Sequence, residues 1–91
     1  MTGPGPYAVL YDPKALKEMA KLDKTVARRM VRAVDELAFD PRPNSARPLT
    51  GHPDLWRVRV GDYRVVYTIK DAALIVLALR VAHRSQVYRN L

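Results

Sequence analysis

The sequence contains no cysteine, which excludes disulfide bonds, thiolate chemistry and cysteine-type zinc sites. It also lacks a long apolar run, since the longest, residues 72–79, is far short of the ~20 residues that a membrane-spanning helix needs. The first residues, MTGPGPY, lack the basic segment and apolar run of a secretory signal. We therefore expect a soluble, cytoplasmic protein without a membrane partner.

Acidic residues are scarce in the second half of the chain. Residues 1–40 carry seven Lys/Arg against six Asp/Glu, whereas residues 41–91 carry nine Lys/Arg against three Asp. In the second half all of these cations except Lys70 are arginines, and a guanidinium can hold two phosphate oxygens at once. This imbalance favours a polyanionic partner, RNA or DNA before a membrane surface; a soluble protein with a merely basic surface is the alternative.

The same scarcity limits the chemistry that the chain could perform. There is no Ser–His–Asp arrangement, no carboxylate cluster suited to Mg²⁺ and no phosphate-binding glycine loop. The acids of the second half, Asp54, Asp62 and Asp71, all stand in predicted turns. Metal-assisted phosphoryl chemistry is therefore not expected, and we predict neither a metal site nor a cofactor.

Length and pattern predict one α+β domain spanning residues 1–91, with residues 1–6 disordered because they are rich in Gly and Pro. Residues 7–11 suit a short strand, and Asp12-Pro13 suits the start of a helix. In that first helix, Leu16, Met19 and Ala20 fall on one face, which we expect to be buried.

A second helix follows, capped by Asp23, and the two helices form an αα-hairpin. Its apolar residues recur at three- and four-residue spacing, which is typical of a face that packs on a core. They are Val26, Met30, Val34 and Leu37. Residues 40–54 hold four of the seven prolines and predict an irregular connection.

Three strands are predicted after this connection, at residues 55–60, 63–69 and 73–81. The element order is therefore β-α-α-β-β-β plus a short C-terminal tail. We expect a small antiparallel sheet of about four strands, with the αα-hairpin packed on one face.

The hairpin WRVRVGDYRVVY, residues 56–67, has an unusual distribution of charge. A two-residue turn at Gly61-Asp62 pairs Arg59 with Arg64 and sets Arg57 opposite Val66. Because side chains alternate between faces, these three arginines share the face away from the helices. The opposite, helix-covered set is Trp56, Val58, Val60, Tyr63, Val65 and Tyr67.

Like charges directly opposite each other destabilise a sheet, so we predict that these arginines bind phosphate. Arg47 of the long connection and Arg80 of the last strand are predicted to contribute to RNA or phosphate binding. The alternative is that the arginines solvate an open face and discourage pairing of the sheet edge with another strand.

Such a face could act on RNA without a metal, because the 2′-OH of RNA can attack the adjacent phosphate. The enzyme must align that hydroxyl, remove its proton, stabilise the phosphorane and protonate the leaving 5′-oxygen. Arginines suit the stabilising task, and the titratable candidates for the proton transfers are His83 and Tyr88. DNA, which lacks the 2′-OH, would be bound without being cut.

Three motifs, in this order and spacing, resemble the RelE toxins of the bacterial RelE/ParE superfamily. They are G-x-P-x-L-W-R-x-R within residues 51–59, G-x-Y-R-[LV]-[VIL]-Y within 61–67 and H-R-x-x-V-Y-R within 83–89. The resemblance implies a small α+β ribonuclease that enters the ribosomal A site and cleaves mRNA. It also implies a cognate antitoxin, which inhibits the toxin and binds operator DNA together with it.

By this resemblance, Arg64 and Arg84 match the arginines that stabilise phosphate and the transition state, and Tyr88 matches a tyrosine near the attacking 2′-OH. Arg57 and Arg59 stand where the best-known members have lysines. Arginine effectively cannot lose a proton, so Arg59 would be a poor general base. His83 then becomes the preferred residue for proton transfer, although it could instead pack or cap on the other face of its strand.

Three functions follow from the sequence. The first is a toxin of a type II toxin–antitoxin system that cleaves mRNA in the A site by metal-independent 2′-OH attack. The second is a ParE-like poison of DNA gyrase, although the H-R-x-x-V-Y ending favours RelE. The third is a non-catalytic module that acts with its antitoxin as a DNA-binding repressor. Within the first function, Tyr88 could instead serve only to stack on a base and hold unstacked RNA.

Overall fold

The structure is a computed structural model that describes residues 5–83. Residues 1–4 and 84–91 lie outside this range, so most of the segment predicted to be disordered, the predicted C-terminal tail, Arg84 and Tyr88 are not described. The elements are β1 (Ala8–Tyr11), α1 (Pro13–Ala20), α2 (Lys24–Glu36), β2 (Arg47–Leu49), β3 (His52–Val60), β4 (Tyr63–Lys70), a 3-10 turn (Asp71–Ala73) and β5 (Ile75–His83).

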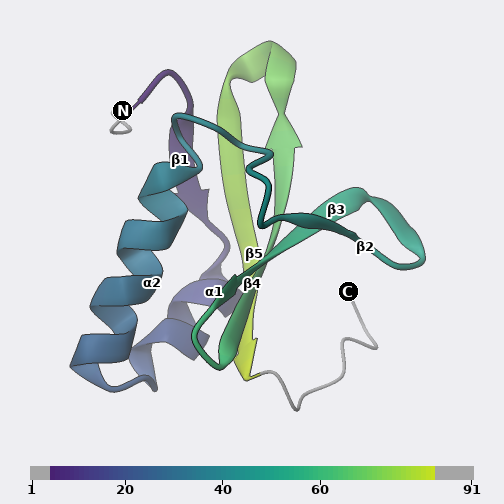
Figure 1. Ribbon diagram of the computed structural model, residues 1–91. Helices are drawn as coiled ribbons and strands as arrows, with labels where there is room; N and C mark the ends of the chain where they lie inside the picture. Colours follow the sequence, from purple (N-terminus) through teal and green to yellow (C-terminus); the bar gives the residue numbers. More distant parts are fainter. Residues whose placement is uncertain (1–4, 84–91) are drawn as a thin grey trace.

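The five strands form one sheet in the order β1-β5-β4-β3-β2, with both helices on one side of it (Figure 1). This arrangement confirms the predicted α+β class and element order. Two details differ from the prediction. The sheet is mixed rather than antiparallel, because β1 pairs in parallel with β5, and it has five strands rather than about four.

The additional strand, β2, lies within the proline-rich connection that the sequence predicts as irregular. It is three residues long, stands at the edge of the sheet and contains Pro48, which has no N–H to donate. Proline is tolerated in a sheet at such an edge position. A short strand formed by tertiary pairing with β3 leaves little local signal in the sequence.

Both helices begin where the sequence predicts. The carboxylate of Asp12 accepts a hydrogen bond from the backbone N–H of Lys14 at 2.9 Å, and that of Asp23 accepts one from Thr25 at 3.0 Å. The prediction of which residues of α1 are buried is wrong in part. Ala15 is fully buried, whereas Leu16 is 52% exposed. A helix of two turns has too few apolar residues for their spacing to define its buried face.

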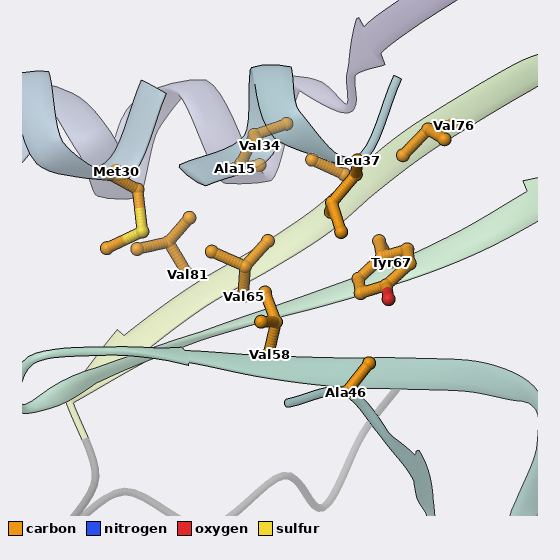
Figure 2. Close-up of a cluster of buried hydrophobic side chains, with 11 residues drawn as sticks. Ala15, Met30, Val34, Leu37, Ala46, Val58, Val65, Tyr67, Val76 and Val81 are labelled. Atoms are coloured by element: carbon orange, nitrogen blue, oxygen red, sulfur yellow. The ribbon is translucent and has the colours of Figure 1, made fainter. Parts of the chain in front are cut away.

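The hydrophobic core lies between α2 and the sheet (Figure 2). Met30 and Val34 of α2 are fully buried, and so is Leu37, the residue that caps the end of this helix, as the predicted stripe requires. On the sheet, Val58, Val65 and Tyr67 belong to the core, and Trp56, Val60 and Tyr63 pack against it. The predicted alternation along β3 and β4 is confirmed, so the arginines between these residues project from the other side.

The long connection is held against the sheet by side chains. The hydroxyl of Tyr67 donates to the carbonyl oxygen of Pro41 at 2.7 Å in a buried position. Next to it, the Arg42 guanidinium binds the carboxylate of Asp71 at 2.8 Å and lies 5.7 Å from the centre of the Trp56 ring. Tyr7 also donates to Asp71, at 2.7 Å. Together Arg42 and Tyr7 lower the pKa of the Asp71 carboxyl by hydrogen bonding.

Candidate phosphate-binding face

Four arginines of neighbouring strands share the face of the sheet that points away from the helices. Arg59 of β3 is paired with Arg64 of β4, as predicted, and Arg57 lies opposite Val66. On its other side Arg57 is paired with Arg47 of β2. The sheet therefore carries two like-charge pairs, Arg47–Arg57 and Arg59–Arg64. We call these four residues the arginine face.

No carboxylate neutralises the arginine face within residues 5–83. The ion pairs found in this range, Arg42–Asp71 and Arg80–Glu18, involve none of the four residues. Arg59 is exposed, and its Nε lies 3.4 Å from the carbonyl oxygen of Gly61, a long contact. Opposite charges would offset the repulsion within the two pairs, so their absence makes this surface electrostatically costly for folding.

Arg47 is tied more firmly to the connection that precedes it. Its Nη1 donates to the carbonyl oxygens of Asn44 and Ala46, the latter at 2.8 Å. These bonds fix the guanidinium without removing its charge. Arg47 can therefore present a positive charge beside Arg57 in a defined position.

Arg64 is the half-buried member of the Arg59–Arg64 pair. Its Nε is buried and has no hydrogen-bond acceptor within the described part of the chain. An unsatisfied buried donor costs roughly 1–3 kcal/mol. Binding of an oxyanion that reaches this N–H would recover part of that cost, which is the behaviour expected of a phosphate site.

The arginine face is not polar throughout. Val66 and Ala82 lie in the same register rows as Arg57 and Arg64, and both are buried although they point away from the helices. This face of the sheet therefore combines arginines with buried apolar residues.

Arg80 differs from the other predicted phosphate-binding residues because its guanidinium already has a partner. Its Nε and Nη2 donate to Oε2 of Glu18 at 3.0 and 2.8 Å. The two side chains are 28% and 23% exposed, so this ion pair is largely shielded from water. The sequence pattern places Glu18 on the outer side of α1 and gives no signal for this contact.

His83 is not brought together with Arg59 and Arg64. It pairs across the sheet with Tyr63, whose side chain lies on the helix-covered side, whereas Arg64 pairs with Ala82. The rings of His83 and Tyr63 meet edge-on, with centroids 5.3 Å apart and planes at 87°. Of the predicted catalytic residues, Arg59 and Arg64 are therefore adjacent, His83 lies on the other side of the strand, and Arg84 and Tyr88 fall outside the described residues.

The position of His83 depends on a bulge in β5. The register steps from Val66–Arg80 to Tyr67–Ala78, which leaves Leu79 as an extra residue. An extra residue exchanges the faces of all the side chains that follow it. Sequence alternation alone cannot reveal such a bulge, because β5 is apolar on both faces up to Arg80.

Comparison with known proteins is consistent with this fold. The family model described as "ParE toxin of type II toxin-antitoxin system, parDE" matches residues 9–88. The chain is 34% identical to "mRNA interferase toxin RelE" of Escherichia coli over 86 residues, 90% of each chain. It is 35% identical to "Toxin RelG" of Mycobacterium tuberculosis over 92 residues, covering 93% of this chain and 99% of that protein.

Solved structures show the same architecture. An archaeal RelE–RelB complex from Pyrococcus horikoshii matches with a TM-score of 0.77 and 29% identity, covering 90% of this chain and 99% of that one. The isolated E. coli RelE toxin matches with a TM-score of 0.76 and 29% identity, covering 89% and 87%. The motifs, the fold and these relatives agree, and the chain belongs to the RelE family of the RelE/ParE superfamily of type II toxin–antitoxin toxins.

Proposed function

We propose that this protein is a ribosome-dependent endoribonuclease toxin, which inhibits translation by cleaving mRNA in the A site. The observation that carries the proposal is the Arg59–Arg64 pair, set on the face away from the helices without a compensating carboxylate in the described range. Such a pair opposes folding and is well suited to a phosphate group. Relatives named mRNA interferases support the same reaction class.

The proposed reaction uses the RNA's own nucleophile. The 2′-oxygen forms a bond to the adjacent phosphorus while the bond from phosphorus to the 5′-oxygen breaks, which gives a 2′,3′-cyclic phosphate and a 5′-hydroxyl. One proton leaves the 2′-OH and one joins the 5′-oxygen. Arg59 and Arg64 stabilise the charge that develops on the phosphorane, as does Arg84 by family resemblance. Arg57 and Arg47 hold the neighbouring backbone.

The proton transfers are assigned to His83 and Tyr88, because an arginine cannot act as a base at ordinary pH. His83 must then leave its contact with Tyr63 and reach round the end of β5 when RNA binds. We expect His83→Ala to slow single-turnover cleavage far more than it weakens ribosome binding. An unchanged rate would instead assign the imidazole to packing on Tyr63.

The partners proposed for the toxin are the ribosomal A site with its mRNA, and a cognate antitoxin. Operator DNA is reached only through the toxin–antitoxin complex. Structures of relatives crystallised as RelE–RelB complexes support the antitoxin. No helix within residues 5–83 is long and apolar enough to cross a membrane. A cytoplasmic site of action is part of the proposal, because that is where the ribosome is found.

Toeprinting of a programmed translation reaction tests the proposal. Purified toxin is expected to produce cuts within A-site codons, and Arg64→Ala is expected to abolish them. Arg28→Ala provides a matched control, because Arg28 is an exposed arginine of α2 outside the arginine face. An intact message would contradict the proposal.

The description of the matching family model names ParE, so gyrase poisoning is the second candidate function. A supercoiling assay separates the two. Inhibited gyrase together with an uncut message would identify a ParE-like activity. Operator binding with the antitoxin, in the absence of both activities, would identify a non-catalytic repressor module.

The identity of the nucleophile needs a test that does not rely on removing metal ions, because ribosomes themselves require Mg²⁺. A message with one 2′-deoxynucleotide at the scissile position removes the proposed nucleophile and leaves the rest of the complex intact. We expect no cleavage at that position. Cleavage of the deoxy-substituted message would indicate attack by water, and thus a different mechanism.

A further inference from the structure

The edge of β5 changes its partner halfway along the strand. Its first half pairs in parallel with β1, from Ala8–Ile75 to Tyr11–Ala78. The backbone N–H of Asp12 adds a last bond to the carbonyl oxygen of Ala78 at 2.8 Å, and the chain then turns into α1. Beyond this point no strand covers that edge of β5 within the described residues.

Glu18 takes the place of the missing strand. Its Oε1 accepts the backbone N–H of Val81 at 2.7 Å, while its Oε2 binds Nε and Nη2 of Arg80. The bulge at Leu79 makes this possible, because it turns the N–H of Val81 rather than that of Arg80 toward the edge. One half-buried carboxylate thus engages both a side chain and the backbone of β5, with charge-assisted bonds that are stronger than neutral ones.

The segment held in this way lies directly beside the arginine face. Val81 and Ala82 pair on their inner side with Val65 and Arg64 of β4, and His83 pairs with Tyr63. Arg84 follows immediately in the sequence. Any movement of this end of β5 would therefore change the position of Arg64 relative to His83.

We infer that Glu18 is a positioning residue, which with Arg80 clamps the end of β5 and sets the geometry of the proposed cleavage site. The inference rests on the proposed function. It also gives Arg80 a role different from the phosphate binding that the sequence predicts. In the clamp, the Arg80 guanidinium is a partner of Glu18 rather than a contact of the RNA phosphate. Misplacement of catalytic groups by about 1 Å can slow a reaction by roughly 100-fold, so a clamp of this kind can act on the rate without touching the substrate.

The rate of single-turnover mRNA cleavage by ribosome-bound toxin tests whether the contacts of Glu18 affect catalysis. Glu18→Ala is expected to lower the cleavage rate by about 10- to 100-fold, while the ribosome concentration that gives half-maximal rate stays unchanged. Glu18→Gln keeps an oxygen for the Val81 N–H but loses the charge, so its rate should lie between those of Glu18→Ala and the wild type. Glu36→Ala, at an exposed position of α2, is the matched control and should cleave at the wild-type rate.

A double-mutant cycle separates the clamp from RNA binding by Arg80. If the two side chains act as one unit, the double variant should be no slower than Glu18→Ala. Arg80→Ala alone should be slowed by no more than Glu18→Ala, because the bond from the Val81 N–H to Glu18 remains. If Arg80 instead contacts RNA independently, Arg80→Ala should weaken ribosome binding, and the two effects should multiply. The latter outcome would overturn the inference.

Amide hydrogen exchange provides a readout that does not depend on activity. The Val81 N–H should exchange faster in Glu18→Ala than in the wild type or in Glu36→Ala. Unchanged exchange at Val81 would refute the clamp whether or not the protein cleaves RNA. Faster exchange with a wild-type cleavage rate would refute the positioning role. A wild-type protein that fails to cleave would refute the proposed function, while the exchange data would still decide whether Glu18 holds β5.

Discussion

At the scale of single residues, the charges of the arginine face suit phosphate binding but lower the stability of the sheet. A like-charge pair directly opposite across two strands costs roughly 0.2–1 kcal/mol. Arg59 and Arg64 form such a pair, and within the described residues neither has a carboxylate partner. Their positions are easier to explain by a ligand than by folding.

Replacing one arginine of the Arg59–Arg64 pair should therefore stabilise the folded protein and lower its cleavage activity. We expect Arg59→Gln to raise the free energy of unfolding by a few tenths to about 1 kcal/mol, as measured by urea denaturation, and to lower the cleavage rate. Arg28→Gln, on the outer side of α2, should change neither quantity appreciably. A loss of stability in Arg59→Gln would show that its aliphatic stem contributes more than the repulsion costs.

Two tyrosines with buried hydroxyl groups, Tyr67 and Tyr11, allow a hydroxyl with a hydrogen-bond partner to be compared with one that lacks a partner within the described residues. The hydroxyl of Tyr67 donates to the carbonyl oxygen of Pro41, whereas that of Tyr11 is buried without a partner in the described range. Tyr67→Phe should destabilise by about 1–2 kcal/mol, because the buried carbonyl loses its donor. Tyr11→Phe should be neutral or slightly stabilising. Equal losses in the two variants would contradict this assignment.

The same tyrosines predict how stability depends on alkaline pH. Burial raises the pKa of both Tyr11 and Tyr67 from 10.0 to about 12. The unfolded chain then releases these protons at a lower pH than the folded protein does. The contribution of these two tyrosines to stability should be constant below about pH 10 and should be lost as the pH rises from about 10 to 12. Urea midpoints measured across this window should fall less steeply in Tyr67→Phe and Tyr11→Phe.

At the scale of elements, the β3–β4 hairpin aligns the central arginine pair. Its two-residue turn begins at Gly61, which has a φ of 60°. L-residues adopt this conformation at a cost of roughly 1–2 kcal/mol. A Cβ at this position would also lie 3.5 Å from an Arg29 nitrogen, an ordinary contact, so the expected penalty is one of backbone conformation rather than of space.

Gly61→Ala should accordingly destabilise the protein by about 1 kcal/mol in thermal or urea denaturation. Gly61→Asn should cost less, because asparagine tolerates positive φ better than other L-residues. If both variants matched the wild type, the turn would be able to relax into another form without disturbing the Arg59–Arg64 register.

At the scale of the whole molecule, the net positive charge is concentrated in the second half of the chain. The chain carries a net charge of +7, and residues 41–91 supply most of it. For binding driven by phosphate contacts, affinity falls linearly with the logarithm of salt concentration, and the slope counts the contacts. The arginine face should contribute a definite part of that slope.

We expect Arg57→Gln to reduce the magnitude of the salt slope of ribosome or RNA binding by about 1. Arg28→Gln removes the same charge elsewhere on the surface and is the control. Its salt slope should equal that of the wild type. Binding titrations at several salt concentrations would measure both. A slope that is unchanged by Arg57→Gln would remove Arg57 from the RNA-binding surface.

Much of this molecule is determined by local sequence. Asp12-Pro13 and Asp23 set the helix starts, and the α2 stripe defines a buried face over three turns. The Gly61-Asp62 turn together with strict alternation fixes the Arg59–Arg64 pair. These features depend on residues close together in the chain, where helix and strand periods and turn geometry act directly. The family motifs lie in the same segments.

Other features were decided only by tertiary structure. The parallel direction of β1, the existence of β2 and the buried face of α1 depend on partners distant in the sequence. So does the bulge at Leu79, which sets His83 against Tyr63 and turns the Val81 N–H toward Glu18. Local periodicity predicts which arginines share a face. The positions of His83 and Glu18 depend instead on long-range contacts of β5 with β4 and α1, which no short window of sequence encodes.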